Sequence, residues 1–236
     1  MTVETQPAPS HSVPPEWFSR LAGRYPALQS AVLLRQLTPP PGASPRHSAV
    51  LVLLGEGPDG PDVLLTQRAT TLRSHAGQVA FPGGRLDDDD DGPVAAALRE
   101  AQEETGVDPD GIDTVTPSVQ LYVPPTDHLV TPVLGWWRRP SPVGPVDPGE
   151  VSRVERVPVA ELTDPANRFR VAHPSGFLGP GFAVRDLFVW GFTAAVLNGV
   201  LVLGGWDRPW DDNRIVPLPD ALTGSTPDPP GQAQRA

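Results

Sequence analysis

A predicted helix at residues 93–105 constrains the fold of this chain more than any other feature. Pro93 suits the first turn of a helix, and Gly106 suits the position just past its end. Leu98 and Ala101 give the helix an apolar side, which must pack against another element. Short apolar runs, typical of buried strands, lie before and after it. Helix and strands mixed in this way predict a single α/β domain.

The other expected elements are short and are separated by turns rich in Gly and Pro. Residues 49–54 and 63–66 predict two strands joined as a hairpin, and residues 78–81 predict a third strand. Residues 15–205 are expected to form one domain, between a disordered tail at 1–14 and a Pro-, Asp- and Gly-rich tail at 206–236. Further strands are expected at 115–123, 129–137, 153–157 and 182–189, and a short helix at 16–28. A second helix is expected where apolar residues recur at helical spacing on one side, at Val189, Phe192, Val196 and Val200.

Composition excludes several classes of function. The net charge of −10 argues against a general nucleic-acid binder, which needs a basic face. The chain has no Cys, so disulfides, thiolate metal sites and Cys nucleophiles are excluded, and it has no Lys, so Arg must do any cationic work. The N-terminus does not resemble a signal peptide and no apolar run is long enough to span a membrane, so the expected location is the cytoplasm.

Three glutamates place negative charge on one side of the predicted helix. Glu100, Glu103 and Glu104 are spaced i, i+3 and i+4, so their carboxylates share a face and repel one another. A hard divalent cation would offset this repulsion, because Mg²⁺ prefers oxygen ligands and uses a few carboxylates together with water and substrate phosphates. The glutamates therefore suit half of a metal site that a diphosphate completes, and the alternative is an ordinary solvated face.

The residues around this face resemble the Nudix box, whose usual form is Gly, five residues, Glu, seven residues, then Arg-Glu-apolar-X-Glu-Glu-X-Gly-apolar. The first half departs from the pattern, because the acidic position falls on Asp90 counting from Gly84, or on Asp91 counting back from Arg99. One residue is therefore extra, and Asp replaces Glu. The second half matches at Arg99, Glu100, Ala101, Glu103, Glu104, Gly106 and Val107.

This altered first half resembles that of the coenzyme A diphosphatase branch of the family, which has Gly-Gly-X-X-Asp-X-X-Asp before Ala-Leu-Arg-Glu-Ala. Asp87 and Asp90 match that pattern, and the resemblance spans residues 49–203. The branch also has an upstream motif, from which this chain departs only at Ala69, where Ser is usual. The upstream matches are Leu64, Leu65, Thr66, Arg68, Leu72, Arg73, His75, Gly77, Gln78, Phe81, Pro82, Gly83 and Gly84.

The resemblance implies an α/β/α sandwich with a mixed β-sheet and the hydrolysis of coenzyme A (CoA) or acyl-CoA, with Mg²⁺ or Mn²⁺ as cofactor. It implies metal ligands at Glu100, Glu103 and Glu104, with Arg99 orienting them. The base would be Glu100 or an acid from a later loop, for which Glu150 is the candidate and Glu155 and Glu161 are weaker ones. The implied substrate-binding residues are Arg68, Arg73, His75, Gln78, Gly83 and Gly84.

Two alternatives stay open. One is a Nudix activity on another compound, such as ADP-ribose, NADH or a nucleoside triphosphate, against which the upstream motif argues. The other is a non-catalytic Nudix-fold ligand sensor, which would usually lack the helix glutamates or carry a DNA-binding domain. The expected partner is a small molecule, with no nucleic acid or membrane, and a homodimer is left open.

Overall fold

Two β-sheets organise the part of the chain that the computed structural model describes, residues 13–32, 38–72, 75–117 and 119–223. In these residues the larger sheet has eight strands, with the central order β3-β2-β1-β7-β5. Strands β4, β6 and β8 pair with β1, β7 and β2. Its strands are β1 (Arg46–Gly57), β2 (Gly60–Arg68), β3 (Val79–Ala80), β4 (Gly83–Arg85), β5 (Ile112–Thr114), β6 (Leu121–Val123), β7 (His128–Trp137) and β8 (Val151–Pro158).

Strand β1 is the centre of the larger sheet. It pairs in parallel with β7 and antiparallel with β2 and β4, so the sheet is mixed as expected. Leu51 and Leu53 face one hydrophobic cluster, whereas Val52 and Leu54 face another. A strand buried on both faces reads as a continuous apolar run, which explains why this segment was recognisable in the sequence.

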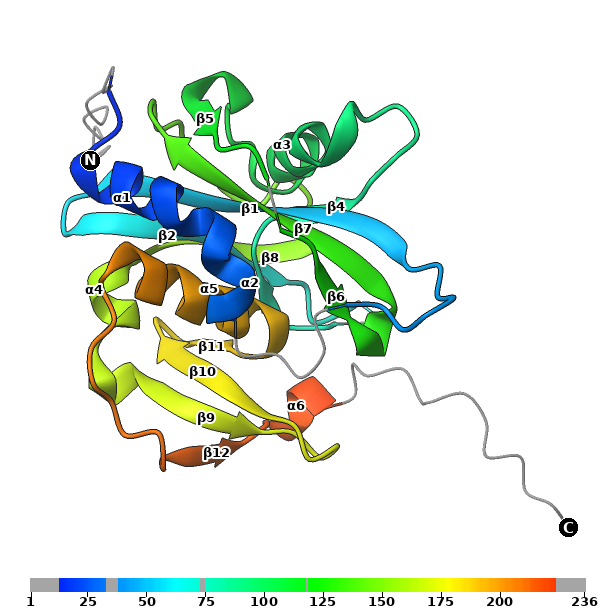
Figure 1. Cartoon of the computed structure of the whole chain (residues 1–236), viewed down its shortest axis with the longest axis vertical. Coiled ribbons are helices and arrows are strands. Elements are labelled where there is room, and N and C mark those ends of the chain that lie inside the picture. The colour runs from blue at the N-terminus through cyan, green and yellow to red at the C-terminus, as the bar shows by residue number, and fades with distance from the viewer. Residues whose placement is uncertain (1–12, 33–37, 73–74, 118, 224–236) are drawn as a thin grey trace, which may run out of the picture.

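Helices cover both faces of this sheet (Figure 1). Helix α3 (Gly92–Thr105) packs on one face, against β1, β4 and β7. On the other face lie α1 (Glu16–Arg24) and α5 (Gly191–Gly204), which pack against each other. The predicted α/β/α sandwich is therefore confirmed. The remaining helices are the short α2 (Leu28–Ala31), α4 (Val159–Leu162) and α6 (Asp220–Thr223), with 3-10 turns at Tyr25–Ala27, Pro109–Gly111, Pro124–Thr126 and Pro165–Asn167.

A second sheet, with the order β11-β10-β9-β12, lies beyond α5 (Figure 1). The sequence predicted one strand at 182–189, and this prediction is wrong. The chain turns back at Arg185 and Asp186, where φ is 50° and 62°, and the two flanking strands pair antiparallel. Such turns usually carry Gly or Asn, so this one gave no sequence signal. The strands are β9 (Arg168–Ala172), β10 (Leu178–Val184), β11 (Leu187–Val189) and β12 (Ile215–Pro217).

The predicted strand at 115–123 is also wrong. Strand β5 ends at Thr114 and β6 begins at Leu121. Pro117 lies between them and has no N–H to donate to a sheet, which accounts for the break.

The segment after residue 205 contributes to the second sheet. Strand β12 pairs in parallel with β9, and Leu218 and Leu222 are buried beside Phe169 and Val171. The predicted domain boundaries stay a prediction. In the described residues, no helix has both the length and the apolar character needed to cross a membrane.

Candidate active site

Helix α3 brings its glutamates close to the sheet because its inner side is made of small residues. Ala96, Ala97 and Ala101 are fully buried against β1, which lets the helix approach closely. Gly106 ends the helix in a left-handed conformation, with φ 71°, and its N–H donates to the Gln102 carbonyl. The predicted helix and its cap are confirmed.

Strand β4 lies against two of the glutamates, Glu100 and Glu104. A Cβ atom at Gly84 would collide with the carboxyl group of Glu100, so only Gly leaves room for it. Gly83 has φ 152° and a Cβ there would collide with the Ala49 carbonyl. Its N–H donates to Glu104 Oε2 at 3.2 Å. The two glycines predicted to bind substrate therefore border both carboxylates.

The carboxylates carry an electrostatic conflict. Burial raises the pKa of Glu104 to about 7, and the negative charges of Glu100 and Glu150 add to this effect. The Gly83 N–H and the positive charge of Arg68 oppose it. Burial also raises the pKa of Glu100. Three carboxylates from two parts of the chain thus face the same region, which would be stabilised by a cation.

Arg99 connects the acidic loop before α3 to the glutamates. Its guanidinium donates two hydrogen bonds to Asp90, at 3.0 and 2.9 Å, and one each to Glu100 and Glu103, both at 3.1 Å. These bonds lower the pKa of Asp90. Of the two positions that the sequence left open for the first acid, Asp90 is the one that contacts Arg99. Asp91 occupies the N-cap of α3, but its side chain makes no capping hydrogen bond.

The third glutamate of the helix is less enclosed than the other two. The Glu103 side chain is 60% exposed, against 20% for Glu100, and pairs with Arg99. Glu103 therefore lies at the outer side of the cluster, and its role as a metal ligand stays a prediction.

Glu150 reaches this region from the loop before β8. Its carbonyl accepts a hydrogen bond from the Ala69 N–H at 2.8 Å, which fixes the loop to the end of β2. The weaker candidates lie in ion pairs elsewhere, Glu155 with Arg153 and Glu161 with Arg185. Glu150 is thus the later acid whose charge acts on Glu104.

Arg68 is the last residue of β2, and its positive charge lowers the pKa of Glu104. Its Nε is buried, and within the described residues it has no hydrogen-bond partner. A buried N–H with no partner, beside a site rich in carboxylates, suits a ligand oxygen. Next to it, His75 Nδ1 lies 2.9 Å from Gln78 Oε1. Arg73 lies outside the described residues.

The donor set fits a hard divalent cation. In the residues that the structure describes, no three His, Asp or Glu side chains are already gathered closely enough to hold an ion alone. Mg²⁺ does not need such a cage, because it commonly takes one or two carboxylates with water and substrate phosphates. Glu100 and Glu104 supply two carboxylates in one place, beside the two glycines of β4, whose missing side chains leave space.

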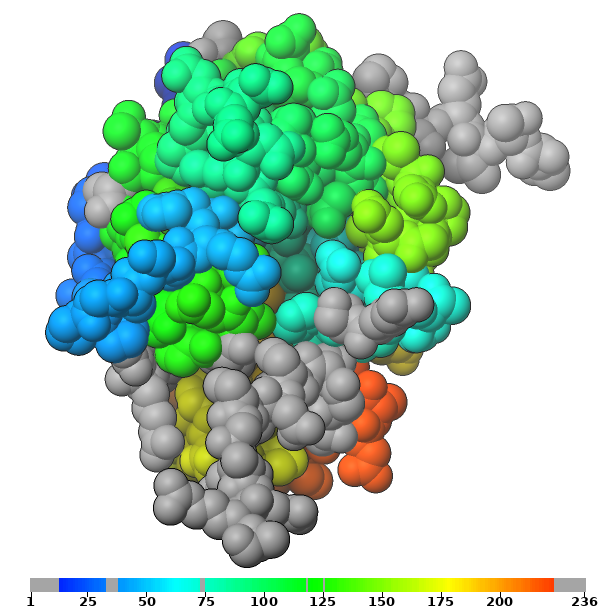
Figure 2. All heavy atoms as spheres, turned by 90° about the vertical axis from the view of Figure 1, so that its right-hand side faces the viewer, coloured from blue at the N-terminus to red at the C-terminus, as the bar shows by residue number. Residues whose placement is uncertain are grey.

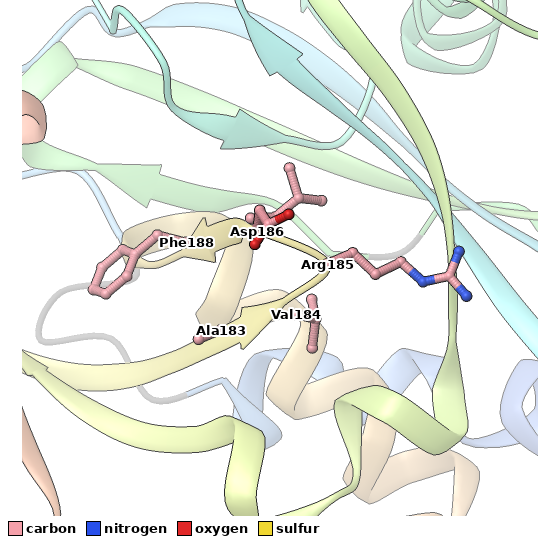
Figure 3. A pocket seen from close by; sticks show the side chains of 6 residues that line it. Ala183, Val184, Arg185, Asp186 and Phe188 are labelled. Atoms are coloured by element: carbon pink, nitrogen blue, oxygen red, sulfur yellow. The ribbon is translucent and has the colours of Figure 1, made fainter.

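The surface is hollowed on the side of the molecule seen in Figure 2. The sky-blue first residues of β1, the green segment around β6 and β7, and the cyan β2–β3 segment border the hollow. A separate cavity of about 400 Å³ lies at the β10–β11 turn, lined by Ala183 to Phe188 (Figure 3). It contains none of the predicted site residues, and its position at the far sheet makes it a poor match for the chemistry.

Three basic residues on the same side were not predicted as site residues from the sequence, namely Arg46, Arg85 and His128. They come together through strand pairing, since Arg46 pairs with His128 and Ser48 with Arg85. The position of Arg85 directly after Gly84 was the only signal in the sequence.

Comparison with known proteins identifies the family. The NUDIX domain family matches residues 45–175, more than half of the chain. A curated relative from Cronobacter sakazakii, named "Uncharacterized Nudix hydrolase NudL", is 41% identical over 164 residues, covering 65% of this chain and 80% of that protein. The relative of the same name from Escherichia coli K12 is 38% identical over 164 residues, with the same coverage.

A plant relative and a solved structure are more distant. "Nudix hydrolase 15, mitochondrial" from Arabidopsis thaliana is 35% identical over 166 residues, covering 65% of this chain and 56% of that protein. The crystal structure of RenU, a Nudix hydrolase from M. smegmatis, is 21% identical, with a TM-score of 0.48, covering 68% of this chain and 86% of that one.

Proposed function

The chain belongs to the Nudix hydrolase family, and from this premise we propose that it is a metal-dependent diphosphatase acting on CoA or acyl-CoA. The products would be 3′,5′-ADP and 4′-phosphopantetheine or its acyl form. One observation carries the proposal. The segment that resembles the CoA branch runs along β2, the following turn, β3 and β4, and ends at the two glycines that border Glu100 and Glu104.

The proposed cofactor is Mg²⁺ or Mn²⁺, held by Glu100 and Glu104 with Glu103 at the outer side. Such an ion neutralises diphosphate charge and lowers the pKa of a bound water. Arg99 positions the ligands, because its guanidinium contacts both Glu100 and Glu103 and is itself anchored by Asp90.

The chain supplies its own groups for proton transfer and charge stabilisation. A water oxygen forms the new bond to phosphorus, and the bridging oxygen leaves with the electrons of the broken P–O bond. Glu150 or Glu100 accepts the proton from the attacking water. Arg68 donates its unpartnered N–H to a diphosphate oxygen, where it stabilises the charge that grows as the bond breaks.

The turn after β2 provides the proposed contacts to the rest of the substrate. The paired His75 and Gln78 side chains lie here, and Arg73 precedes His75 by two residues in the sequence. Each can donate hydrogen bonds to phosphate or amide oxygens. These assignments rest on the family resemblance and on the position of the turn beside Arg68.

The variant Glu104→Gln tests this assignment. We expect metal-dependent release of 3′,5′-ADP from CoA to fall by at least about a hundredfold, because losing even an outer partner of a metal ligand costs about 10–100-fold. Glu16→Gln is the matched control, since it removes one exposed carboxylate on α1 and should leave turnover unchanged. Turnover near the wild-type rate in Glu104→Gln would show that the metal assignment is wrong.

A further inference from the structure

Strand pairing gathers three basic residues on one face of the larger sheet. Arg46 of β1 pairs with His128 of β7, and Ser48 of β1 pairs with Arg85 of β4. Because alternate residues of a strand point to the same face, Arg46 and Ser48 lie on one face, with their partners beside them. The next residue, Ala49, points the other way and packs towards α3, so the basic residues lie on the face away from α3.

Hydrogen bonds hold Arg46 and His128 in place and leave other polar atoms of both side chains available. The Ser48 hydroxyl lies 2.9 Å from His128 Nδ1, and Nε2 of the ring has no hydrogen-bond partner among the described residues. One guanidinium nitrogen of Arg46 donates to the Thr126 carbonyl at 2.8 Å. The remaining N–H groups of Arg46 stay available, because Arg carries five donors.

The two arginines of this cluster are not paired with carboxylates in the described residues. Within the described residues, neither Arg46 nor Arg85 forms an ion pair, although the protein has a net charge of −10. Asp127, the residue before His128, accepts a hydrogen bond from the Tyr122 hydroxyl at 2.9 Å. Burial lowers the pKa of His128, the positive charges of Arg46, Arg85 and His75 lower it further, and the negative charge of Asp127 opposes them. An anion bound here would relieve this repulsion.

The cluster and the candidate catalytic carboxylates lie on opposite faces of β4. Gly84 faces Glu100, whereas the next residue, Arg85, points to the other face of the strand. In the described residues β4 pairs only with β1, so a ligand at its unpaired edge can contact both faces. The positive charge of His75, in the turn after β2, also acts on His128. Figure 2 shows the first residues of β1 at the edge of the hollow on this side.

We propose that Arg46, Arg85 and His128 bind a phosphate monoester of the substrate, separate from the diphosphate that is cut. The inference rests on the proposed function and deepens it. CoA carries a 3′-phosphate on the ribose next to its diphosphate, whereas ADP-ribose and NADH carry a hydroxyl there. The cluster therefore selects CoA over substrates that are otherwise alike near the cleaved bond.

The test compares CoA with dephospho-CoA, which differs only in this phosphate. We expect Arg85→Gln to lower kcat/KM for CoA by about tenfold or more, the size of a lost charge-assisted hydrogen bond. For dephospho-CoA the loss should stay below about twofold, so the preference for CoA falls. Arg20→Gln is the matched control, because it removes one positive charge from the exposed α1 surface and should change neither substrate.

Equal losses on both substrates, or an unchanged preference, would overturn the inference. If the wild-type protein cleaves neither substrate, the proposed function fails and the site is tested by binding instead. Calorimetry with adenosine 3′,5′-bisphosphate and adenosine 5′-monophosphate gives that readout. Tighter binding of the bisphosphate that Arg85→Gln abolishes would support the site, and equal binding of the two would contradict it.

Discussion

Glu104 shows how one residue can be unfavourable for folding and favourable for function. Its carboxylate is largely enclosed. The Gly83 N–H at 3.2 Å and the positive charge of Arg68 favour its ionised form. An enclosed carboxylate without a full set of partners resists ionisation. Such a group gains most from a cation, which is why the site fits a divalent metal.

We expect the metal-free protein to lose stability through Glu104 as the pH rises from about 4.5 to about 7. Burial raises the pKa of Glu104 from 4.5 to about 7, so between these values the folded chain keeps a proton that the unfolded chain has released. The stability is therefore complete below pH 4.5 and is lost as the pH rises through 7, by roughly 3 kcal/mol at most.

Urea unfolding of the wild type and Glu104→Gln in chelator measures this effect. The variant should be the more stable of the two at pH 8, and the difference should shrink towards pH 4.5. A difference that does not change with pH would contradict the assigned cause.

Asp90 provides a second prediction at this scale. Removing its charge by Asp90→Asn leaves Arg99 without its double ion pair, so the guanidinium no longer has a fixed position beside Glu100. We expect kcat for CoA to fall by about tenfold, as for other outer partners of metal ligands. Asp88→Asn, in the same exposed loop, should stay near the wild-type rate, and equal effects of the two changes would show that only the loop's total charge matters.

The sequence predicted some of these residues and not others, for physical reasons. Glu100 and Glu104 are one helical turn apart, and the helix signal was local, so their common face could be predicted. The approach of Glu150 to Glu104 depends on the pairing of β2 with β8, far apart in the chain. The cluster of Arg46, Arg85 and His128 likewise depends on strand register, which has no local signal.

At the scale of elements, the close packing of β4 against α3 creates the site. Two glycines have different tasks in it. Gly83 has a backbone conformation that other residues rarely adopt, whereas Gly84 leaves room for the Glu100 carboxyl group. The sequence indicated that glycines here permit close approach, and only the structure separates the two tasks.

Alanine substitutions of the two glycines should therefore differ. Gly83→Ala should lower the free energy of unfolding by about 2 kcal/mol or more, because the new Cβ meets the Ala49 carbonyl and the φ of 152° becomes strained. Gly84→Ala should change it by less than about 1 kcal/mol, since the Glu100 carboxylate can move away, but should lower kcat at least about tenfold. Urea unfolding and CoA turnover measure both. The reverse pattern would contradict these roles.

For the whole molecule, the second sheet encloses α5 from the side opposite the large sheet. Residues of α5 are buried together with Phe182, Leu187 and Val189 of that sheet. The C-terminal segment completes it through β12 and two buried leucines, although its Pro and Asp content suggested a tail. A few apolar residues are enough to hold this segment in place, because they fill a small core separate from the main one. The homodimer stays a prediction.

We expect this small core to contribute measurably to stability. Leu218 is 4% exposed, so Leu218→Ala should lower the free energy of unfolding by about 2–3 kcal/mol. Ile215 on the same segment is 53% exposed, and Ile215→Ala should change it by less than about 0.5 kcal/mol. Equal small effects would mean that the segment after residue 205 does not belong to the folded unit.

The hydrolysis of CoA is the central claim, and a substrate comparison tests it most directly. The purified protein is incubated with Mg²⁺ or Mn²⁺ and, in parallel, with CoA, ADP-ribose, NADH or dGTP, and the products are separated by chromatography. We expect metal-dependent release of 3′,5′-ADP from CoA, faster than turnover of the other three compounds. Cleavage of another compound with CoA left intact would contradict the substrate, and no turnover of any would contradict the enzyme activity itself.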